Sequence, residues 1–261
     1  FFVIFLILVL AQKIIIARTA IEPEQELERL QKIGISAITV FDKAYPQNLK
    51  EIYNPPALLF YLGDLNCLNQ DCLAVVGARK NSSYGQSAVE QIVKPLARAG
   101  ITIISGLALG IDALAHQAAL AGGGLTAAVL GSDLDWKNIG PKTNSVLAQK
   151  ILDSGGCLLS EFPLGTTPSK STFPQRNRII SGLAKGVLII EAGESSGSLI
   201  TANYGLEQNR DIFAVPGNIF SQSSQGTNNL IKKGAKIVTE AEDIISELQW
   251  QTAFNCQPKI S

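Results

Sequence analysis

Short apolar runs alternate with longer mixed stretches along most of the chain. From Leu73 onward, each apolar run is followed by a stretch with helical spacing. Runs that are apolar throughout indicate strands covered on both faces, and strands that alternate with helices indicate right-handed crossovers in a parallel sheet. The expected strands are 73–77, 101–106, 125–131, 157–161, 186–193 and 211–217. The pattern predicts an α/β fold with a doubly wound, mostly parallel sheet.

The part before Leu73 has a different organisation. Leu27, Leu30 and Ile33 have helical spacing and Gly34 closes that helix. A strand over 35–40 follows, and prolines then mark an irregular link to the apolar stretch 57–63. We therefore expect three parts: an apolar N-terminal segment and short helical lead-in module over 1–70, a Rossmann-like domain over 71–248, and a C-terminal tail over 249–261.

The first 17 residues are unusually apolar. The run from Phe1 to Ala11 is shorter than the roughly 20 residues that a membrane-spanning helix needs. No basic segment precedes the run, which makes it a poor signal peptide. A truncated or mis-started gene product, or a core helix left from a lost N-terminal domain, is the favoured interpretation. A membrane anchor is the alternative.

The composition of the chain limits the range of functions that it can have. Apolar residues make up 46% and charged residues 17% of the chain, and the formal net charge is zero. A large core is therefore expected, and any nucleic-acid contact must rest on a local basic patch. The cysteines form no CxxC pair and the single histidine is distant from them, which argues against a metal site and suits reduced thiols in the cytoplasm. They are Cys67, Cys72, Cys157 and Cys256.

The turns that follow the predicted strands are rich in glycine and hydroxyl side chains. Ligands of such sheets bind beyond the carboxyl ends of the strands, where glycines allow close approach and helix N-termini offer unpaired N–H groups. The turn residues expected to face a phosphate-bearing ligand are Gly77, Ser105, Gly106, Gly110, Gly197, Ser198 and Thr201. Neither a Walker A pattern nor GxGxxG is present, which disfavours nucleotide hydrolysis and ordinary dinucleotide binding.

Two stretches carry basic residues and no acid. One lies between Cys72 and Val89 and the other between Phe162 and Ile190. Together they predict a local positive field, and the nearby aromatics Tyr84 and Phe173 suit stacking with single-stranded bases. Core packing and solvated charge are the alternatives for each residue. The basic residues are Arg79, Lys80, Lys170, Arg176, Arg178 and Lys185, the last of which also suits a helix C-terminus.

Four ionisable residues are candidates for chemistry. Asp112 and His116 share a helix face, as a catalytic pair or a hydrogen-bonded structural pair. Glu161 and Glu191 end apolar strands, where they can pair with arginines or contact a ligand. No nucleophile has an evident base, so the sequence proposes no catalytic residue and no enzyme. The alternative is a nucleotide sensor or nucleotide-cleaving enzyme in which Asp112 and Glu191 act as acid and base.

Several longer motifs coincide with these turns: VVGARKNSSYG, ISGLALGIDALAHQAAL, LLSEFP, FPQRNRIISGL and IIEAGESSGSLITA. In this combination the chain resembles the DNA-processing protein A (DprA/Smf) family over roughly residues 25–240. The resemblance implies an extended Rossmann-like domain, without a cofactor, that binds single-stranded DNA in a basic pocket. It also implies a homodimer that protects incoming DNA during natural transformation and loads the RecA recombinase.

The resemblance extends to individual positions. It matches the DNA-pocket arginine of the family to Arg79, the basic residue before the FPxRNR motif to Lys170, and the RNR pair to Arg176 and Arg178. The full set of expected DNA-contacting residues is Arg79, Lys80, Ser83, Lys170, Phe173, Arg176 and Arg178. A Tyr-Pro motif of the family is missing from 132–141, where Trp136 is a candidate replacement for the ring. We expect the tail over 249–261 to stand in place of the winged-helix domain that many members of the family carry.

Overall fold

The computed structural model describes residues 12–13, 15, 18 and 22–251. Most of the apolar run predicted over 1–17 therefore lies outside the described residues. Helix α2 (Pro23–Lys32) has acidic residues in its first turn and Arg29 and Lys32 in its last turn, which complements the helix dipole. Among the helices that are described, none has the length and apolar character to cross a membrane.

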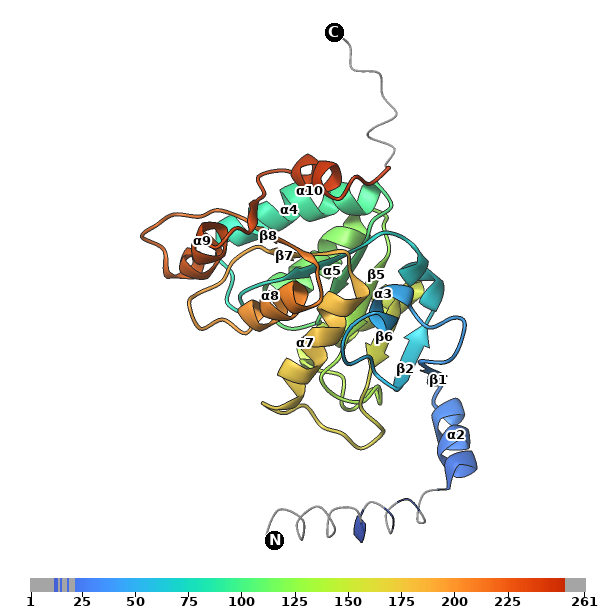
Figure 1. Ribbon diagram of the computed structural model, residues 1–261. Helices are drawn as coiled ribbons and strands as arrows, with labels where there is room; N and C mark the ends of the chain where they lie inside the picture. The colour runs from blue at the N-terminus through green and yellow to red at the C-terminus, as the bar shows by residue number, and fades with distance from the viewer. Residues whose placement is uncertain (1–11, 14, 16–17, 19–21, 252–261) are drawn as a thin grey trace, which may run out of the picture. The chain divides into compact units, whose positions relative to one another are not determined.

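From Ala37 the described chain forms a second compact unit built on one nine-stranded sheet (Figure 1). The order is β1-β2-β6-β5-β4-β3-β7-β8-β9; β2 is antiparallel to β6, and the neighbours from β6 to β9 are parallel. The strands are β1 (Ser36–Thr39), β2 (Leu58–Gly63), β3 (Cys72–Val76), β4 (Thr102–Ser105), β5 (Thr126–Val129), β6 (Cys157–Ser160), β7 (Gly186–Ile189), β8 (Asp211–Ala214) and β9 (Lys236–Ile237). The predicted α/β class with a mostly parallel sheet is confirmed.

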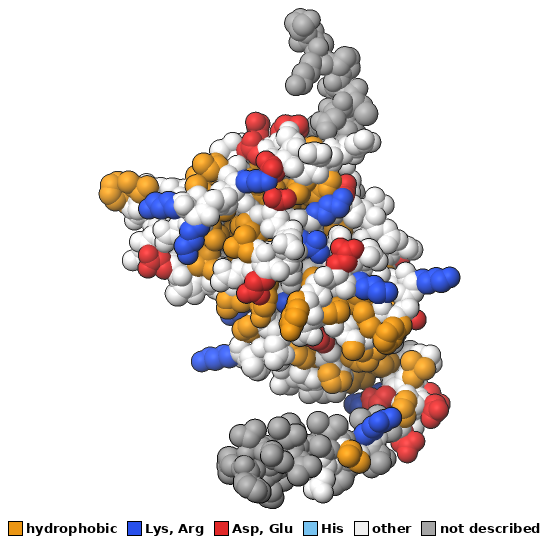
Figure 2. Space-filling model, in the orientation of Figure 1, with side chains coloured by type: hydrophobic (Ala, Val, Ile, Leu, Met, Phe, Trp, Pro, Cys, Tyr) orange, Lys and Arg blue, Asp and Glu red, His pale blue; other side chains and the backbone are white. Residues whose placement is uncertain are grey.

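Helices cover both faces of this sheet. Residues of α4 (Ser83–Arg98), α5 (Ile111–Ala121) and α10 (Ala241–Glu247) belong to one buried apolar cluster. Residues of α3 (Gln47–Lys50), α7 (Thr172–Leu183), α8 (Ser198–Glu207) and α9 (Gln225–Lys232) belong to another. Helix α6 (Ser145–Asp153) packs beside α5. Charged side chains of both signs are spread over the face in Figure 2.

The central strand β3 shows why its sequence is apolar throughout. Its five residues are all buried. Leu73 and Val75 face the cluster with α4 and α5, whereas Ala74 and Val76 face the cluster with α7 and α8. Successive side chains of a strand point to opposite faces, so a strand covered on both faces needs apolar residues at every position.

The strand order reverses beside β3. From β3 the chain proceeds outward through β4, β5 and β6, returns through α7 to β7 on the other side of β3, and continues to β8 and β9. A crevice is expected beyond the carboxyl ends of the two strands at such a reversal. The fold therefore places the candidate site between the loops that follow β3 and β7.

The observed organisation differs from the sequence expectation at both ends. The boundary predicted near Asn69 falls inside this unit, because β2 pairs with β6 in the same sheet. Strand β9 and helix α10 were not predicted, since each is short. The second residue of the predicted tail is packed: the side chain of Trp250 is buried, and its backbone N–H donates to the carbonyl of Ile245. The rest of that tail, 252–261, lies outside the described residues.

Candidate functional site

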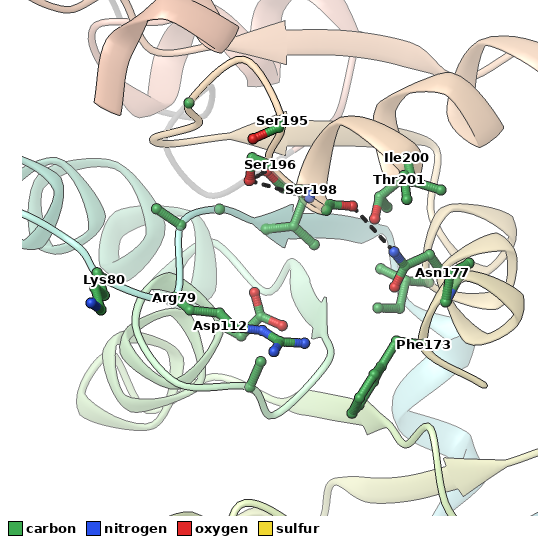
Figure 3. A pocket seen from close by; sticks show the side chains of 18 of the residues that line it. Arg79, Lys80, Asp112, Phe173, Asn177, Ser195, Ser196, Ser198, Ile200 and Thr201 are labelled. Carbon is green, nitrogen blue, oxygen red and sulfur yellow. Dashed lines mark hydrogen bonds between the residues drawn. The ribbon is translucent and has the colours of Figure 1, made fainter. Parts of the chain in front are cut away.

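A hollow of about 800 Å³ opens where the strand order reverses. The loops after β3 and β7 and the N-terminal parts of α7 and α8 line it. In Figure 3, Arg79, Lys80 and Asp112 lie on one side, and Phe173 and Asn177 lie on the other. The expected site residues among its lining are Gly77, Arg79, Lys80, Lys170, Phe173, Arg176, Gly197, Ser198 and Thr201.

Three cations of the lining are solvent-exposed: Arg79, Lys80 and Lys170. Within the described part of the chain, none of them forms a salt bridge. The guanidinium carbon of Arg79 lies 5.1 Å from the centre of the Phe173 ring, which is a cation–π distance. These cations give a neutral protein a locally positive hollow.

Arg176 lines the hollow but is already engaged. Its side chain is buried, and Nη1 donates to the carbonyls of Gly106 and Val129. Burial lowers the pKa of this guanidinium to about 10, against the opposing effect of Asp112, so Arg176 remains charged at neutral pH. Arg176 thus bridges the ends of β4 and β5 and adds charge beneath the hollow, whereas its expected role as a direct ligand contact is not supported by this geometry.

The carboxylate of Asp112 occupies the place where we expected a phosphate. Its Oδ2 accepts from the N–H of Gly106 at 3.2 Å, and the backbone N–H groups of Ala108 and Gly77 also bond to it. Burial raises the pKa of Asp112, while Arg176 and these backbone bonds lower it. The expectation that the amides of Gly77 and Gly106 hold ligand phosphates is therefore wrong, because an internal anion already takes them.

Two more of the expected turn residues have structural roles. The hydroxyl of Ser105 donates to the carbonyl of Val75 at 2.6 Å and is fully buried. Gly110 has φ of 79°, and a Cβ there would lie 2.3 Å from the carbonyl oxygen of Ala78. A glycine is needed at that turn for its conformation and for close packing of the two loops.

The N-terminus of α8 is a second part of the hollow where an anion could bind, beside the loops after β3 and β4. Gly197 is exposed, with open space where a Cβ would stand, and the helix has no side-chain cap bond and no acid in its first turn. Ser196 and Ser198 share a hydroxyl hydrogen bond of 2.7 Å beside it. The backbone N–H groups of Ser198, Leu199 and Ile200 already bond within this turn, to the hydroxyl and carbonyl of Ser196 and the carbonyl of Gly197. The exposed glycine, the two hydroxyls and the positive end of the helix dipole still suit a phosphate, so this side of the hollow is the better anion site.

Several expected contacts lie elsewhere. Arg178 forms an ion pair with Glu161, with side chains 12% and 27% exposed, and does not line the hollow. Lys185 pairs with Asp71 at 2.6 Å, just before β7 begins. Ser83 lines a separate hollow between α4 and α5. The structure therefore does not bring these three residues to the candidate site.

The remaining acidic candidate, Glu191, holds loops together. It is buried and accepts from the N–H and the hydroxyl of Ser82 at 2.9 and 2.6 Å, and from the hydroxyl of Ser223 at 3.1 Å. These bonds connect the loops after β3, β7 and β8. The tyrosine expected beside the basic stretch, Tyr84, likewise donates to the carbonyl of Pro216 at 2.6 Å.

His116 pairs with a strand residue. Its Nδ1 lies 2.6 Å from the hydroxyl of Thr126, which itself donates to the carbonyl of Ile103. The hydroxyl proton is thereby committed, so Nδ1 must be the donor. Burial lowers the pKa of His116 to about 3, and the charge of Arg176 adds to the effect. Since Asp112 bonds to backbone amides, both readings of Asp112 and His116 as a pair are wrong.

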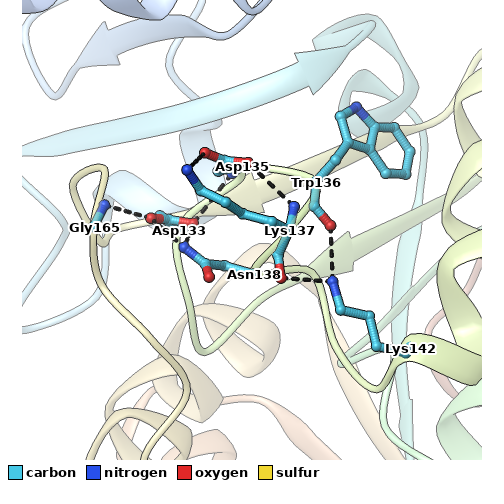
Figure 4. Close-up of polar contacts among 7 residues, drawn as sticks. All are labelled: Asp133, Asp135, Trp136, Lys137, Asn138, Lys142 and Gly165. Carbon is cyan, nitrogen blue, oxygen red and sulfur yellow. Dashed lines mark hydrogen bonds and ion pairs between the residues drawn. The ribbon is translucent and has the colours of Figure 1, made fainter.

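A smaller hollow of about 210 Å³ shares Arg79 and Phe173 with the larger one. Gly140 and Pro141 line it, from the loop that lacks the Tyr-Pro motif. Asp133 organises this loop by accepting from the side chain of Asn138 and the N–H of Gly165 (Figure 4). Trp136, the candidate replacement ring, lines neither hollow.

The sequence did not single out Gln222 and Ser223, which also line the larger hollow. They follow β8 by eight or more residues and sit in a short helical turn. Ser223 brings them to the crevice, because its hydroxyl donates to Glu191 and its carbonyl accepts from the N–H of Ala192 at 2.8 Å. No local signal marks such a residue, because its position depends on a bond to a distant strand.

Fold and site together define a Rossmann-like α/β protein with a basic crevice at the reversal of its strand order. Residues 36–249 match the family model of the DNA recombination-mediator protein A, and the chain belongs to this family. It is 48% identical to Protein Smf of Escherichia coli over 227 residues, covering 87% of this chain and 60% of that protein. The chain thus spans less than two thirds of that relative.

Two solved structures are similar. DNA processing protein A (DprA) of Streptococcus pneumoniae superposes with a TM-score of 0.81 at 41% identity, covering 89% of this chain and 80% of that chain. DNA processing protein A of Helicobacter pylori, whose structure concerns its single-stranded DNA binding mode, gives a TM-score of 0.73 at 29% identity. It covers 82% of this chain and 95% of that chain.

Proposed function

We propose that this protein binds single-stranded DNA in the 800 Å³ hollow and serves DNA processing without catalysing a reaction itself. The observation that carries the proposal is a set of three exposed cations around one hollow of a neutral protein, Arg79, Lys80 and Lys170, which form no salt bridge with any residue that the structure describes. The single-stranded DNA binding of the Helicobacter pylori relative supports it.

Each part of the hollow suits a part of a nucleotide chain. Arg79, Lys80 and Lys170 neutralise phosphates, and the start of α8 at Gly197 adds the hydroxyls of Ser196 and Ser198 and the positive end of the helix dipole. The half-buried ring of Phe173 provides an apolar surface for a base. Phosphate contacts and stacking carry little sequence information, so binding is sequence-tolerant.

We also propose, from membership of the family, that the protein acts as a cytoplasmic homodimer that protects incoming DNA and delivers it to the RecA recombinase. The alternative of a nucleotide-cleaving enzyme has less support. Asp112 and Glu191, its candidate acid and base, are both buried and each accepts several hydrogen bonds. Calorimetry with mononucleotides separates the two, since the enzyme requires tight binding and turnover.

The decisive experiment is the affinity for single- and double-stranded DNA across salt concentrations. Three neutralised phosphates on a single strand give a log–log slope of about −2, at about −0.7 for each phosphate. Arg79→Ala weakens single-strand binding and makes the slope shallower by about 0.7. The matched control is Arg98→Ala, an exposed arginine at the far end of α4. Equal effects of the two substitutions would remove Arg79 from the site.

A further inference from the structure

The loop between β8 and α9 carries two neighbouring apolar side chains in solvent. Ile219 is 75% exposed and Phe220 is 89% exposed. The loop projects at the left of Figure 1, and apolar side chains stand out at the corresponding place in Figure 2. Single exposed apolar residues are ordinary, so the pair becomes informative only through the way it is held and the place where it lies.

The base of this loop is held by several hydrogen bonds. The side chain of Asn228 exchanges two with the backbone of Gly217, at 3.1 and 3.2 Å. Asn218 accepts from the N–H of Phe220 through its side chain and from the N–H of Ser221 through its carbonyl, both at 2.9 Å. The turn therefore presents Ile219 and Phe220 outward in a set conformation, which lowers the entropy lost when a ligand binds there.

The tip of this loop, formed by Ile219 and Phe220, lies close to the hollow because neighbouring residues of the same loop line it. Gln222 and Ser223 line the hollow, and two residues of extended chain span at most about 7 Å, so Phe220 lies within that distance of the rim at Gln222. A nucleotide chain that leaves the hollow over this rim meets the tip. The stretch 215–224 contains no charged residue, so the loop adds no cation for a phosphate, whereas Ile219 and Phe220 offer an apolar surface to a base.

We infer that Phe220, flanked by Ile219, stacks with a base of the single strand where the strand leaves the hollow, so that the binding site extends beyond the basic pocket onto this loop. The inference rests on the proposed binding of single-stranded DNA. It adds an uncharged contact on the β8–α9 loop. The affinity should therefore depend on the length of the strand and on the presence of bases, and the cations of the hollow alone predict neither dependence.

The test compares Phe220→Ala with Phe41→Ala, because Phe41 is 90% exposed and lines none of the hollows described above. Anisotropy titrations use a long oligo-dT, a short oligo-dT that the hollow can hold alone, and a long abasic strand. Phe220→Ala weakens binding of the long oligo-dT on the order of fivefold. It leaves the salt slope and the affinities for the short and abasic strands unchanged, and Phe41→Ala changes nothing. Phe220→Trp retains the wild-type affinity, whereas Phe220→Leu does not.

Other results overturn the inference in separable ways. Equal affinities of Phe220→Ala and Phe41→Ala, beside salt-dependent binding by the wild type, remove the stacking contact and leave the proposed function intact. Full affinity of Phe220→Leu also removes it. A wild-type dimer that dissociates in Phe220→Ala during sedimentation assigns the tip to a second copy of the chain instead. Absence of any single-strand binding by the wild type overturns both the proposed function and the inference.

Discussion

The guanidinium carbon of Arg79 lies 5.1 Å from the centre of the Phe173 ring. The two residues come from different sides of the crevice: Arg79 from the loop after β3 and Phe173 from the first turn of α7. A cation held over an aromatic face loses fewer side-chain conformations when it binds an anion. The pair thus couples the charged and the apolar parts of the hollow.

We predict that this coupling is measurable in a double-mutant cycle. Phe173→Leu weakens single-strand binding but leaves the salt slope unchanged, because it removes no charge. In combination, Arg79→Ala and Phe173→Leu cost less than the sum of the single losses, by about 0.5–1 kcal/mol. The measurement is the affinity for oligo-dT of wild type, both single variants and the double variant. Strictly additive losses contradict the coupling.

A second prediction concerns Arg178. Its ion pair with Glu161 is largely withdrawn from solvent, and it does not line the hollow. Arg178→Ala therefore lowers the free energy of unfolding by about 2 kcal/mol, as the loss of a hydrogen bond to a charged group predicts, and leaves the affinity for single-stranded DNA within twofold of wild type. Urea unfolding and anisotropy are the measurements. The control is Lys170→Ala, which weakens binding of single-stranded DNA and leaves the free energy of unfolding close to that of wild type. A loss of DNA affinity in Arg178→Ala larger than that in Lys170→Ala contradicts the assignment.

Arg176 and Arg178 make different contacts, which the sequence motif alone did not distinguish. Residues two apart on a helix do not face the same way, and both lie on α7. One points beneath the hollow and the other toward Glu161. The resemblance offered both as DNA contacts, whereas the helical period alone already favours at most one of them.

Much of the fold was predictable because the signal is local. The apolar run of β3 and the turn at Gly110 each reflect their immediate surroundings. The expectation of a ligand beyond the carboxyl ends of the strands also came from the α/β pattern, whereas the point of reversal depends on the strand order, which no local pattern specifies. The role of Asp112 was not predictable, because its carboxylate takes amides from two loops that come together only in the folded sheet.

A third prediction follows from the bridging role of Arg176. Arg176→Ala leaves the carbonyls of Gly106 and Val129 without this donor and removes the charge that faces the buried Asp112. Removing one partner of a buried charge arrangement costs about 3–5 kcal/mol. We expect a loss of that order in urea unfolding, with Arg98→Ala within about 0.5 kcal/mol of wild type. Unchanged stability would show that Arg176 is free to contact a ligand.

A fourth prediction uses His116, the only histidine of the chain. Its pKa is about 3 in the folded protein, below the ordinary value of 6.5, because burial disfavours the charged ring. Between these two pH values the unfolded chain binds a proton that the folded chain does not. This contribution to stability is therefore complete above pH 6.5 and is lost as the pH falls toward 3, by up to about a factor of ten in the unfolding constant for each pH unit.

Asp112 acts in the opposite direction, because burial raises the pKa of its carboxyl above 3.8. As the pH falls toward 3.8, the folded protein binds the proton of Asp112 more readily than the unfolded chain does, so this contribution to stability grows. The variant His116→Asn separates the two effects: its amide can replace Nδ1 as donor to Thr126 and does not titrate. Urea unfolding at pH values from 7 down to 4 should show the wild type losing stability relative to this variant below pH 6.5. A difference between the two proteins that stays constant with pH would mean that His116 is already protonated in the folded state or is exposed to solvent.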